Sequence, residues 1–206
     1  MKKDENIKEK FKQALISTVK AISEDFNDNQ NLEQKNKSSK NYNFFDLDNL
    51  NNRYDFLRFR AETDSEALKR KFSNKKIYLK NLPSKPTLRS LYNISEKIRY
   101  EKLGTKILQG VGKNIVDNYN RQISLKRKDQ LKSKEDTTIS EAFEIYMLKH
   151  FLKVTPNSLC EKILSFWEDE FKNSFGKHLN YLKDKVEDQE LFSEKFTEIL
   201  HELDFR

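Results

Sequence analysis

Apolar residues recur every three or four positions along most of this chain, and no other feature limits its fold as strongly. The first such stretch covers residues 7–24, and its stripe consists of Ile7, Phe11, Leu15, Val19 and Ile22. Glycine, which loosens helices, occurs only four times in 206 residues. The period therefore predicts an all-α protein.

Later stretches with the same period predict an irregular multi-helix bundle of about seven or eight helices. They begin near residues 50, 86, 111, 139, 156, 179 and 191. One segment departs from the period. The run Ile77–Leu79 stands between lysines and is followed by Pro83, which suits a short extended piece and leaves room for one short β-hairpin.

Several residues carry signals for helix ends. Thr63–Glu66 and Thr138–Glu141 have capping-box spacing, although one helix running from about residue 50 to 73 is an equal alternative to a start at Thr63. Thr155-Pro156 reads as an N-cap followed by proline. Gly104 is predicted to end a helix after Leu103. Gly110 and Gly112 are predicted to bracket a turn.

The pattern divides the chain into three parts. We predict an amino-terminal amphipathic helix over residues 1–26, a flexible linker or loop over 27–50, and a helical domain over 51–206. The linker is rich in Asn, Gln, Lys and Ser, which bury little apolar surface. Its last part, residues 43–50, suits either a short strand or an irregular docked segment.

The composition excludes several classes of protein. Four glycines leave no room for a P-loop or a dinucleotide-binding fingerprint. A single cysteine excludes an internal disulfide framework. No stretch approaches the roughly 20 apolar residues of a membrane span, and the first residues are charged rather than apolar. We therefore expect a cytoplasmic protein that does not enter a membrane.

Side chains that bind metals or attack substrates are few and scattered. The soft-ligand candidates are His150, Cys160, His178 and His201. No two of them stand three or four residues apart, whereas a zinc site needs three or four convergent ligands. Cys160 falls on an apolar stripe, where it suits the core better than catalysis. We therefore expect neither a metal site nor a catalytic residue.

The formal charge of +7 is unevenly distributed, with +11 in residues 41–135 and −6 in residues 136–206. Aromatic residues lie among basic ones in Arg53-Tyr54, in Phe56–Arg60 and in Lys75–Lys80, as they do in grooves that bind single-stranded nucleic acid. The same aromatic residues also fall at core spacing. A basic helical nucleic-acid-binding module is therefore the alternative interpretation of this chain.

Five segments, in order, resemble the T subunit (CobT) of the aerobic, ATP-dependent cobaltochelatase. The first is the helix Phe11–Ile22. The second, Arg60–Phe72, is similar to R-x-E-A-D-S-x-A-L-x-L-R of that family. The third, Arg99–Asn114, is similar to R-V-E-A-x-G followed by G-V-x-x-N. The last two are Ile163–Trp167, similar to L-D-L-W, and Val186–Phe192, similar to D-D-Q-x-x-F.

The resemblance implies a non-catalytic subunit that assists cobalt insertion into a corrinoid, hydrogenobyrinic acid a,c-diamide, in cobalamin biosynthesis. The implied partners are an AAA+ ATPase subunit and the large catalytic subunit of this nitrogen–metal ligase. The complex uses ATP, Mg and cobalt, and we expect this chain to bind no cofactor itself. The family's T subunit normally adds a von Willebrand A-type domain, which is not expected within residues 1–206. The chain would then be a truncated or split subunit or a stand-alone relative.

The resemblance also singles out a set of residues that we expect to be structural or to take part in docking. They are Arg60, Asp64, Ser65, Arg99, Glu101, Gly104, Gly110, Asn114, Trp167, Asp188, Gln189 and Phe192. Among the charged members of this set, we expect Arg60, Asp64, Arg99 and Glu101 to form one buried or half-buried ion-pair network. Trp167 is expected in the core.

Overall fold

The computed structural model describes residues 2–23, 52–125 and 131–202. All regular structure within these ranges is helical, which confirms the predicted all-α class. The predicted linker over 27–50, including the ambiguous segment 43–50, lies outside the described residues.

The helices follow one another through short connections. Their bounds are α1 Lys2–Ser23, α2 Arg53–Phe72, α3 Lys75–Lys80, α4 Pro86–Ile107, α5 Gln109–Leu125, α6 Ile139–Met147, α7 Ser158–Ser165, α8 Glu168–Phe175, α9 Leu179–Asp184 and α10 Gln189–Glu202. Tighter or wider turns occur at Lys134–Asp136 and Gly176–His178 (3₁₀) and at Leu148–Leu152 (π). The carboxy-terminal part is thus divided into shorter helices than its apolar period predicted.

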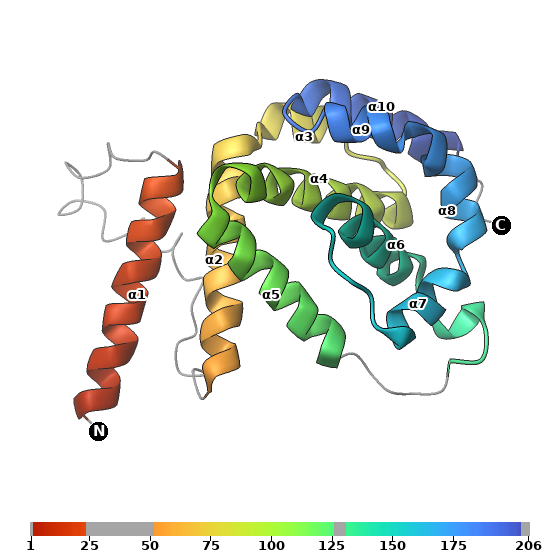
Figure 1. Cartoon of the computed structure of the whole chain (residues 1–206). Coiled ribbons are helices and arrows are strands. Elements are labelled where there is room, and N and C mark those ends of the chain that lie inside the picture. Colours follow the sequence, from red (N-terminus) through yellow and green to blue (C-terminus); the bar gives the residue numbers. More distant parts are fainter. Residues whose placement is uncertain (1, 24–51, 126–130, 203–206) are drawn as a thin grey trace.

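Helix α4 occupies the middle of the molecule (Figure 1). It contacts α2, α5, α6, the π turn and α10. Helix α1 lies along the outer side of α2, and α8, α9 and α10 form an arc over the opposite end (Figure 1). The bundle is therefore organised around one central helix, which is buried on about half of its surface.

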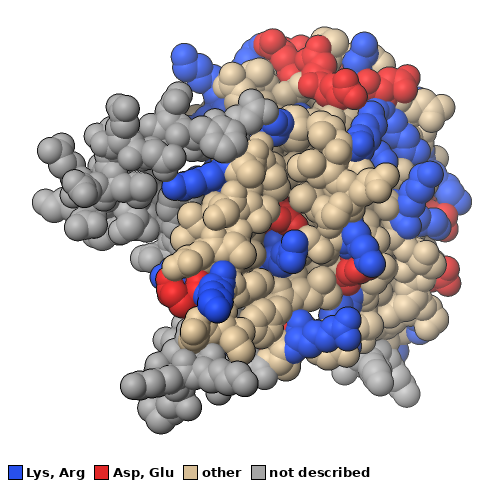
Figure 2. Space-filling model, turned by 60° about the vertical axis from the view of Figure 1, so that its left-hand side comes forward, with Lys and Arg blue, Asp and Glu red and all other residues tan. Residues whose placement is uncertain are grey.

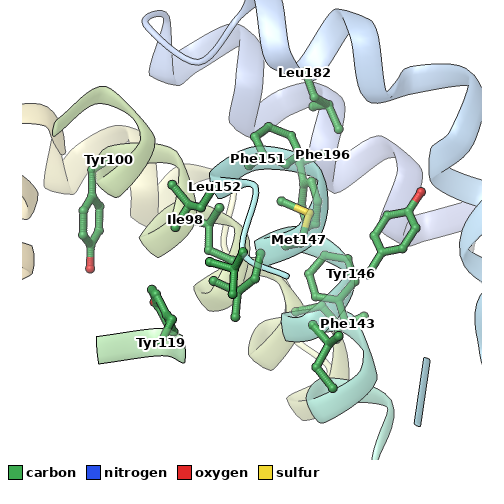
Figure 3. Close-up of a cluster of buried hydrophobic side chains, with 14 of the residues drawn as sticks. Ile98, Tyr100, Tyr119, Phe143, Tyr146, Met147, Phe151, Leu152, Leu182 and Phe196 are labelled. Atoms are coloured by element: carbon green, nitrogen blue, oxygen red, sulfur yellow. The ribbon is translucent and has the colours of Figure 1, made fainter. Parts of the chain in front are cut away.

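The main core lies where α4, α6, α8 and α10 meet, and aromatic side chains fill much of it. Figure 3 shows Phe143, Tyr146 and Phe151 pointing into this region together with Ile98 of α4 and Phe196 of α10. A smaller cluster joins α1 to α2 and consists of Phe11, Leu15, Phe56 and Phe59. Helix α1 is thus attached by its own apolar contacts as well as by Val19 and Ile22, which reach the main core.

Helix α2 is one continuous helix that begins well before Thr63. Its N-cap is Asn52, whose Oδ1 accepts hydrogen bonds from the N–H groups of Tyr54 (2.8 Å) and Asp55 (3.2 Å). Asp55 Oδ2 accepts in return from the Asn52 N–H, which completes a capping box. The hydroxyl of Thr63 donates to the Phe59 carbonyl inside the helix, so Thr63 is not a cap.

The predicted extended piece at Ile77–Leu79 is wrong, and no β-hairpin occurs among the described residues. These residues belong to α3, which is capped by Asn74 through a 2.8 Å hydrogen bond from the Lys76 N–H. A three-residue apolar run fits a strand and a helix equally well, and here the cap and the contact with α10 favour the helix.

Two other predicted caps have different outcomes. Thr138 caps α6 as predicted, since its Oγ1 accepts from the Glu141 N–H at 3.2 Å. Thr155-Pro156 does not begin α7. That helix is capped by Asn157, whose Oδ1 accepts from the Cys160 N–H at 2.9 Å. Asparagine and threonine are both good caps, so spacing alone did not separate them.

The predicted helix stop at Gly104 is wrong, because α4 continues to Ile107. A Cβ at Gly104 would lie 2.2 Å from Cδ1 of Leu68, so the missing side chain lets α4 approach α2 closely. Gly110 and Gly112 lie within the first turn of α5 rather than bracketing a turn. A Cβ at Gly112 would come within 3.0 Å of the Thr105 backbone. Gly104 and Gly112 therefore serve helix packing.

Gly104→Ala is expected to lower the free energy of unfolding by about 1–2 kcal/mol. The clash with the fully buried Leu68 is an overpacking effect of about 1–3 kcal/mol, which exceeds the gain in helix propensity of up to about 1 kcal/mol. Gly110→Ala is the matched control, because nothing lies within 4 Å of its Cβ position. Urea denaturation of both variants checks this, and a Gly104→Ala variant as stable as Gly110→Ala would contradict it.

Candidate functional site

Helix α4 carries one buried ion pair that faces α10. Arg99 Nε donates to the Glu96 carboxylate at 3.3 and 3.4 Å, and neither residue is appreciably exposed. Glu96 also accepts from the Gln189 amide (2.9 Å) and from the Ser193 hydroxyl (2.8 Å). We call these four residues the Arg99 cluster. It joins α4 to the first two turns of α10 through charged hydrogen bonds.

The guanidinium of Arg99 also binds main chain. Nη2 donates to the Phe72 carbonyl at 2.7 Å and Nη1 donates to the Val186 carbonyl at 3.2 Å. The first carbonyl ends α2 and the second lies just before α10. Gln189 Oε1 accepts from the Asn74 N–H at 2.6 Å. One arginine therefore connects three segments that are distant in the sequence.

A second cluster lies where α2, α4 and α5 meet, and we call it the Glu101 cluster. Glu101 Oε1 accepts from the Ser65 hydroxyl at 2.6 Å and Oε2 accepts from the Tyr119 hydroxyl at 2.8 Å. Burial raises the pKa of Glu101, although the charge of Lys97 and these two hydrogen bonds oppose the rise. Burial likewise raises the pKa of Tyr119 well above its ordinary value.

Asp64 and Asn114 form a smaller polar contact between α2 and α5. Asn114 Nδ2 donates to Asp64 Oδ2 at 2.8 Å, while the buried Oδ1 has no hydrogen-bond partner within the described structure. Burial raises the pKa of Asp64, and the hydrogen bond from Asn114 and the charge of Arg60 oppose the rise. Arg60 itself is exposed.

The four charged residues expected in one network are thus divided between separate contacts. Arg99 pairs with Glu96, which the sequence analysis did not single out, and Glu101 is held by two hydroxyl groups. The spacing of Glu96 and Arg99, three residues apart on one helix, was a usable signal. It was missed because exposed residues with this spacing are common and only the fold shows that this pair is buried.

Three further residues singled out by the resemblance pack against the core or cap a helix. Trp167 is half-buried against the core, and its Nε1 donates to the Thr137 hydroxyl at 2.9 Å. Asp188 Oδ1 accepts from the Leu191 N–H at the start of α10. Phe192 is fully buried in the core.

Next to these clusters, α2 and α4 border an open groove with two adjacent hollows. The larger, about 570 Å³, extends to α3 and is lined by Lys69, Lys75, Tyr78, Leu79 and neighbours. The smaller, about 240 Å³, extends to α5 and reaches Glu101 and Tyr119. Both are lined by Glu66, Lys97 and Tyr100, so they form one surface that we call the α2–α4 groove.

The candidate metal ligands do not converge within the described residues, where no group of three His, Cys, Asp or Glu side chains is placed to hold an ion. Cys160 is fully buried in the core. The ring of His150 packs against Tyr146 at 4.4 Å between centroids, and burial lowers the pKa of this imidazole.

The aromatic residues that suggested nucleic-acid binding are mostly engaged in packing. Phe56 packs edge-to-face on Phe11 of α1, and Phe59 is buried in the same cluster. Tyr78 packs against Tyr92 at 5.4 Å between ring centroids. On the face that Figure 2 shows, Lys and Arg side chains are interspersed with Asp and Glu side chains and with uncharged surface.

The stability of the Glu101 cluster is expected to depend on pH. The pKa of Glu101 is higher in the folded chain than its ordinary value of 4.5. The folded state therefore binds more protons, and this group's contribution to the free energy of unfolding falls as the pH rises from about 4.5 through the folded-state pKa. The Glu101→Gln variant lacks this titration, so wild type should lose stability relative to it as the pH rises.

Urea denaturation between pH 4 and 8 measures this difference. Glu135→Gln is a control of opposite sign, because a hydrogen bond with Ser133 lowers the pKa of the exposed Glu135. Wild type should gain stability relative to that variant as the pH rises. A constant difference between wild type and Glu101→Gln across this range would contradict the prediction.

Comparisons with known proteins place this arrangement in a family. No helix in the described part of the chain combines the length and the apolar character needed to cross a membrane. No match was found among curated proteins or among solved structures. Residues 5–206 match the family described as "Cobalamin biosynthesis protein CobT". Because that match covers nearly the whole chain, including both buried clusters and the groove, the chain belongs to the CobT family and thereby to cobalamin biosynthesis and its cobaltochelatase.

Proposed function

We propose that this chain is a non-catalytic subunit of the ATP-dependent cobaltochelatase, acting in the cytoplasm by docking to the AAA+ ATPase subunit and through it to the large catalytic subunit. Membership of the CobT family over residues 5–206 is the observation that carries the proposal. ATP, Mg and cobalt are used by the complex, with cobalt inserted into hydrogenobyrinic acid a,c-diamide as the substrate metal.

The contacts of the buried ionisable groups support a docking role. Glu96 and Arg99 bind each other and the neighbouring main chain, and both oxygens of Glu101 accept hydrogen bonds from this chain. Buried charges satisfied in this way hold helices in fixed positions. The chain thus offers a rigid helical surface with an open groove.

Reconstitution tests the proposed role. The AAA+ subunit and the large subunit from the same organism are combined with and without this chain, and cobalt insertion is followed by corrinoid absorbance with ATP and Mg present. We expect insertion only with this chain, and co-elution of this chain with the ATPase in size-exclusion chromatography. Full insertion without this chain would overturn the proposal.

An electrophoretic mobility assay with single-stranded DNA and RNA tests the alternative function, nucleic-acid binding. Under the docking proposal, binding is negligible at physiological salt. Tight binding that weakens steeply between low and physiological salt, with no co-elution of the ATPase, would favour the nucleic-acid interpretation.

A further inference from the structure

The larger hollow of the α2–α4 groove has a cationic rim. Four cationic side chains line it, namely Lys69, Arg70, Lys75 and Lys97, and two acidic ones, Glu66 and Glu96. Both acidic groups have cationic partners in this chain, since Glu66 pairs with Lys69 and Arg70 and Glu96 pairs with Arg99. The rim therefore carries excess positive charge.

Two of these lysines are exposed and available to a ligand. Among the described residues, Lys75 forms no ion pair, and neither does Lys97, whose ammonium lies 5.3 Å from the ring centre of Tyr119. Lys75 lies on α3 and Lys97 on α4, at different parts of the same hollow. An anionic ligand that spans the hollow can therefore meet both charges.

Apolar side chains lie between these charges. Leu79 lines the larger hollow and is 53% exposed. The rings of Tyr78 and Tyr100 line the same hollow, and the Tyr78 hydroxyl is held by Asn93 Oδ1. These three side chains form an apolar seat for one aliphatic or aromatic side chain.

Resting on the proposed function, we propose that the α2–α4 groove docks an acidic peptide segment of the partner ATPase subunit. One apolar side chain of that segment occupies the seat formed by Tyr78, Leu79 and Tyr100, and flanking carboxylates bind Lys75 and Lys97. Charge complementarity sets the orientation of the segment and speeds its association, while the buried apolar side chain supplies most of the affinity.

The groove suits a peptide better than a nucleic acid. The charged residues that line its smaller hollow are Glu62, Glu66, Glu101 and Lys97, so the closely spaced phosphates of a nucleic acid would meet more acidic than basic side chains there. A peptide can place its few carboxylates at the two lysines and remain uncharged beside the glutamates. The Arg99 cluster next to the groove holds α2, α4 and α10 in place and so keeps the seat open.

Photo-crosslinking in the reconstituted complex tests the proposal. The full chain carries p-benzoylphenylalanine in place of Leu79, or in place of Tyr181 on α9 as an exposed control (40% exposed). We expect the Leu79 position to crosslink to an ATPase peptide with at least two Asp or Glu within about five residues of the crosslink. The Tyr181 position should not give that product.

A charge-reversal pair adds a quantitative readout. Lys75→Glu with Lys97→Glu should weaken ATPase binding roughly tenfold or more at low salt, as expected for reversed charges that steer docking. Lys149→Glu with Lys177→Glu changes the net charge equally at other exposed positions and should have little effect. Circular dichroism verifies that all variants are folded.

The outcomes separate this proposal from the proposed function. If wild type does not co-elute with the ATPase, both fail. If it does co-elute, the groove proposal alone is overturned by any of four results: no partner crosslink from Leu79, a crosslinked peptide without acidic residues, a crosslink to this chain or to nucleic acid, or equal weakening by the two charge-reversal pairs.

Discussion

Replacing Arg99 with methionine lowers the free energy of unfolding by about 3–5 kcal/mol, the range expected when one partner of a buried ion pair is removed. Arg99 is fully buried, and its loss leaves Glu96 charged without a cation and the carbonyls of Phe72 and Val186 without a donor. Urea denaturation followed by circular dichroism measures the change.

The control for this effect is Arg89→Met on the same helix. Arg89 also donates to two carbonyls, those of Pro83 and Ser84, but it is exposed to water. Water replaces its lost contacts, so the expected loss is below about 1 kcal/mol. Similar losses of unfolding free energy for the two variants would contradict this prediction, because they would show that burial does not strengthen the contribution of the Arg99 hydrogen bonds.

Phe143→Ala is also expected to lower the free energy of unfolding by about 3–5 kcal/mol, because it removes apolar contacts and creates a cavity. The Phe143 ring is fully buried and lies 5.2–5.8 Å from the ring centres of Phe171, Phe175 and Phe196. Its removal leaves a hole between α6, α8 and α10. Thermal or urea denaturation measures the loss for the whole domain.

Phe56→Ala provides the comparison, because Phe56 packs on Phe11 in the small cluster between α1 and α2. We expect a smaller global loss, and faster hydrogen exchange confined to α1. A global loss as large as that of Phe143→Ala would show that the α1 contact and the main core unfold as one unit.

Local signals in the sequence predicted some helix boundaries and missed others, because a short segment does not always show which structure it forms. The cap at Thr138 was recognised because the helix after it has a clear apolar stripe. The helix at Lys75–Lys80 was missed because six residues are too few to show a period. Gly104 was interpreted as a stop, since a glycine chosen for helix contact and one chosen for a helix end look alike in sequence.

Some residues of the two buried clusters were singled out from the sequence, but their pairing was not predicted. The resemblance singled out Arg99, Glu101, Ser65 and Gln189, all of which are buried in polar contacts. It did not indicate that Arg99 pairs with Glu96 or that Tyr119 donates to Glu101. It gave no indication of the α2–α4 groove.

The amino-acid order alone determined that this chain is helical, where most of its helices begin, and which family it resembles, because periodicity and short motifs are local properties. Only the tertiary structure decided which charges are buried and which partners they have. It brought Ser65, Glu101 and Tyr119 together from three helices and placed Gly104 against Leu68. Burial depends on all helices packing at once, and no single segment contains that information.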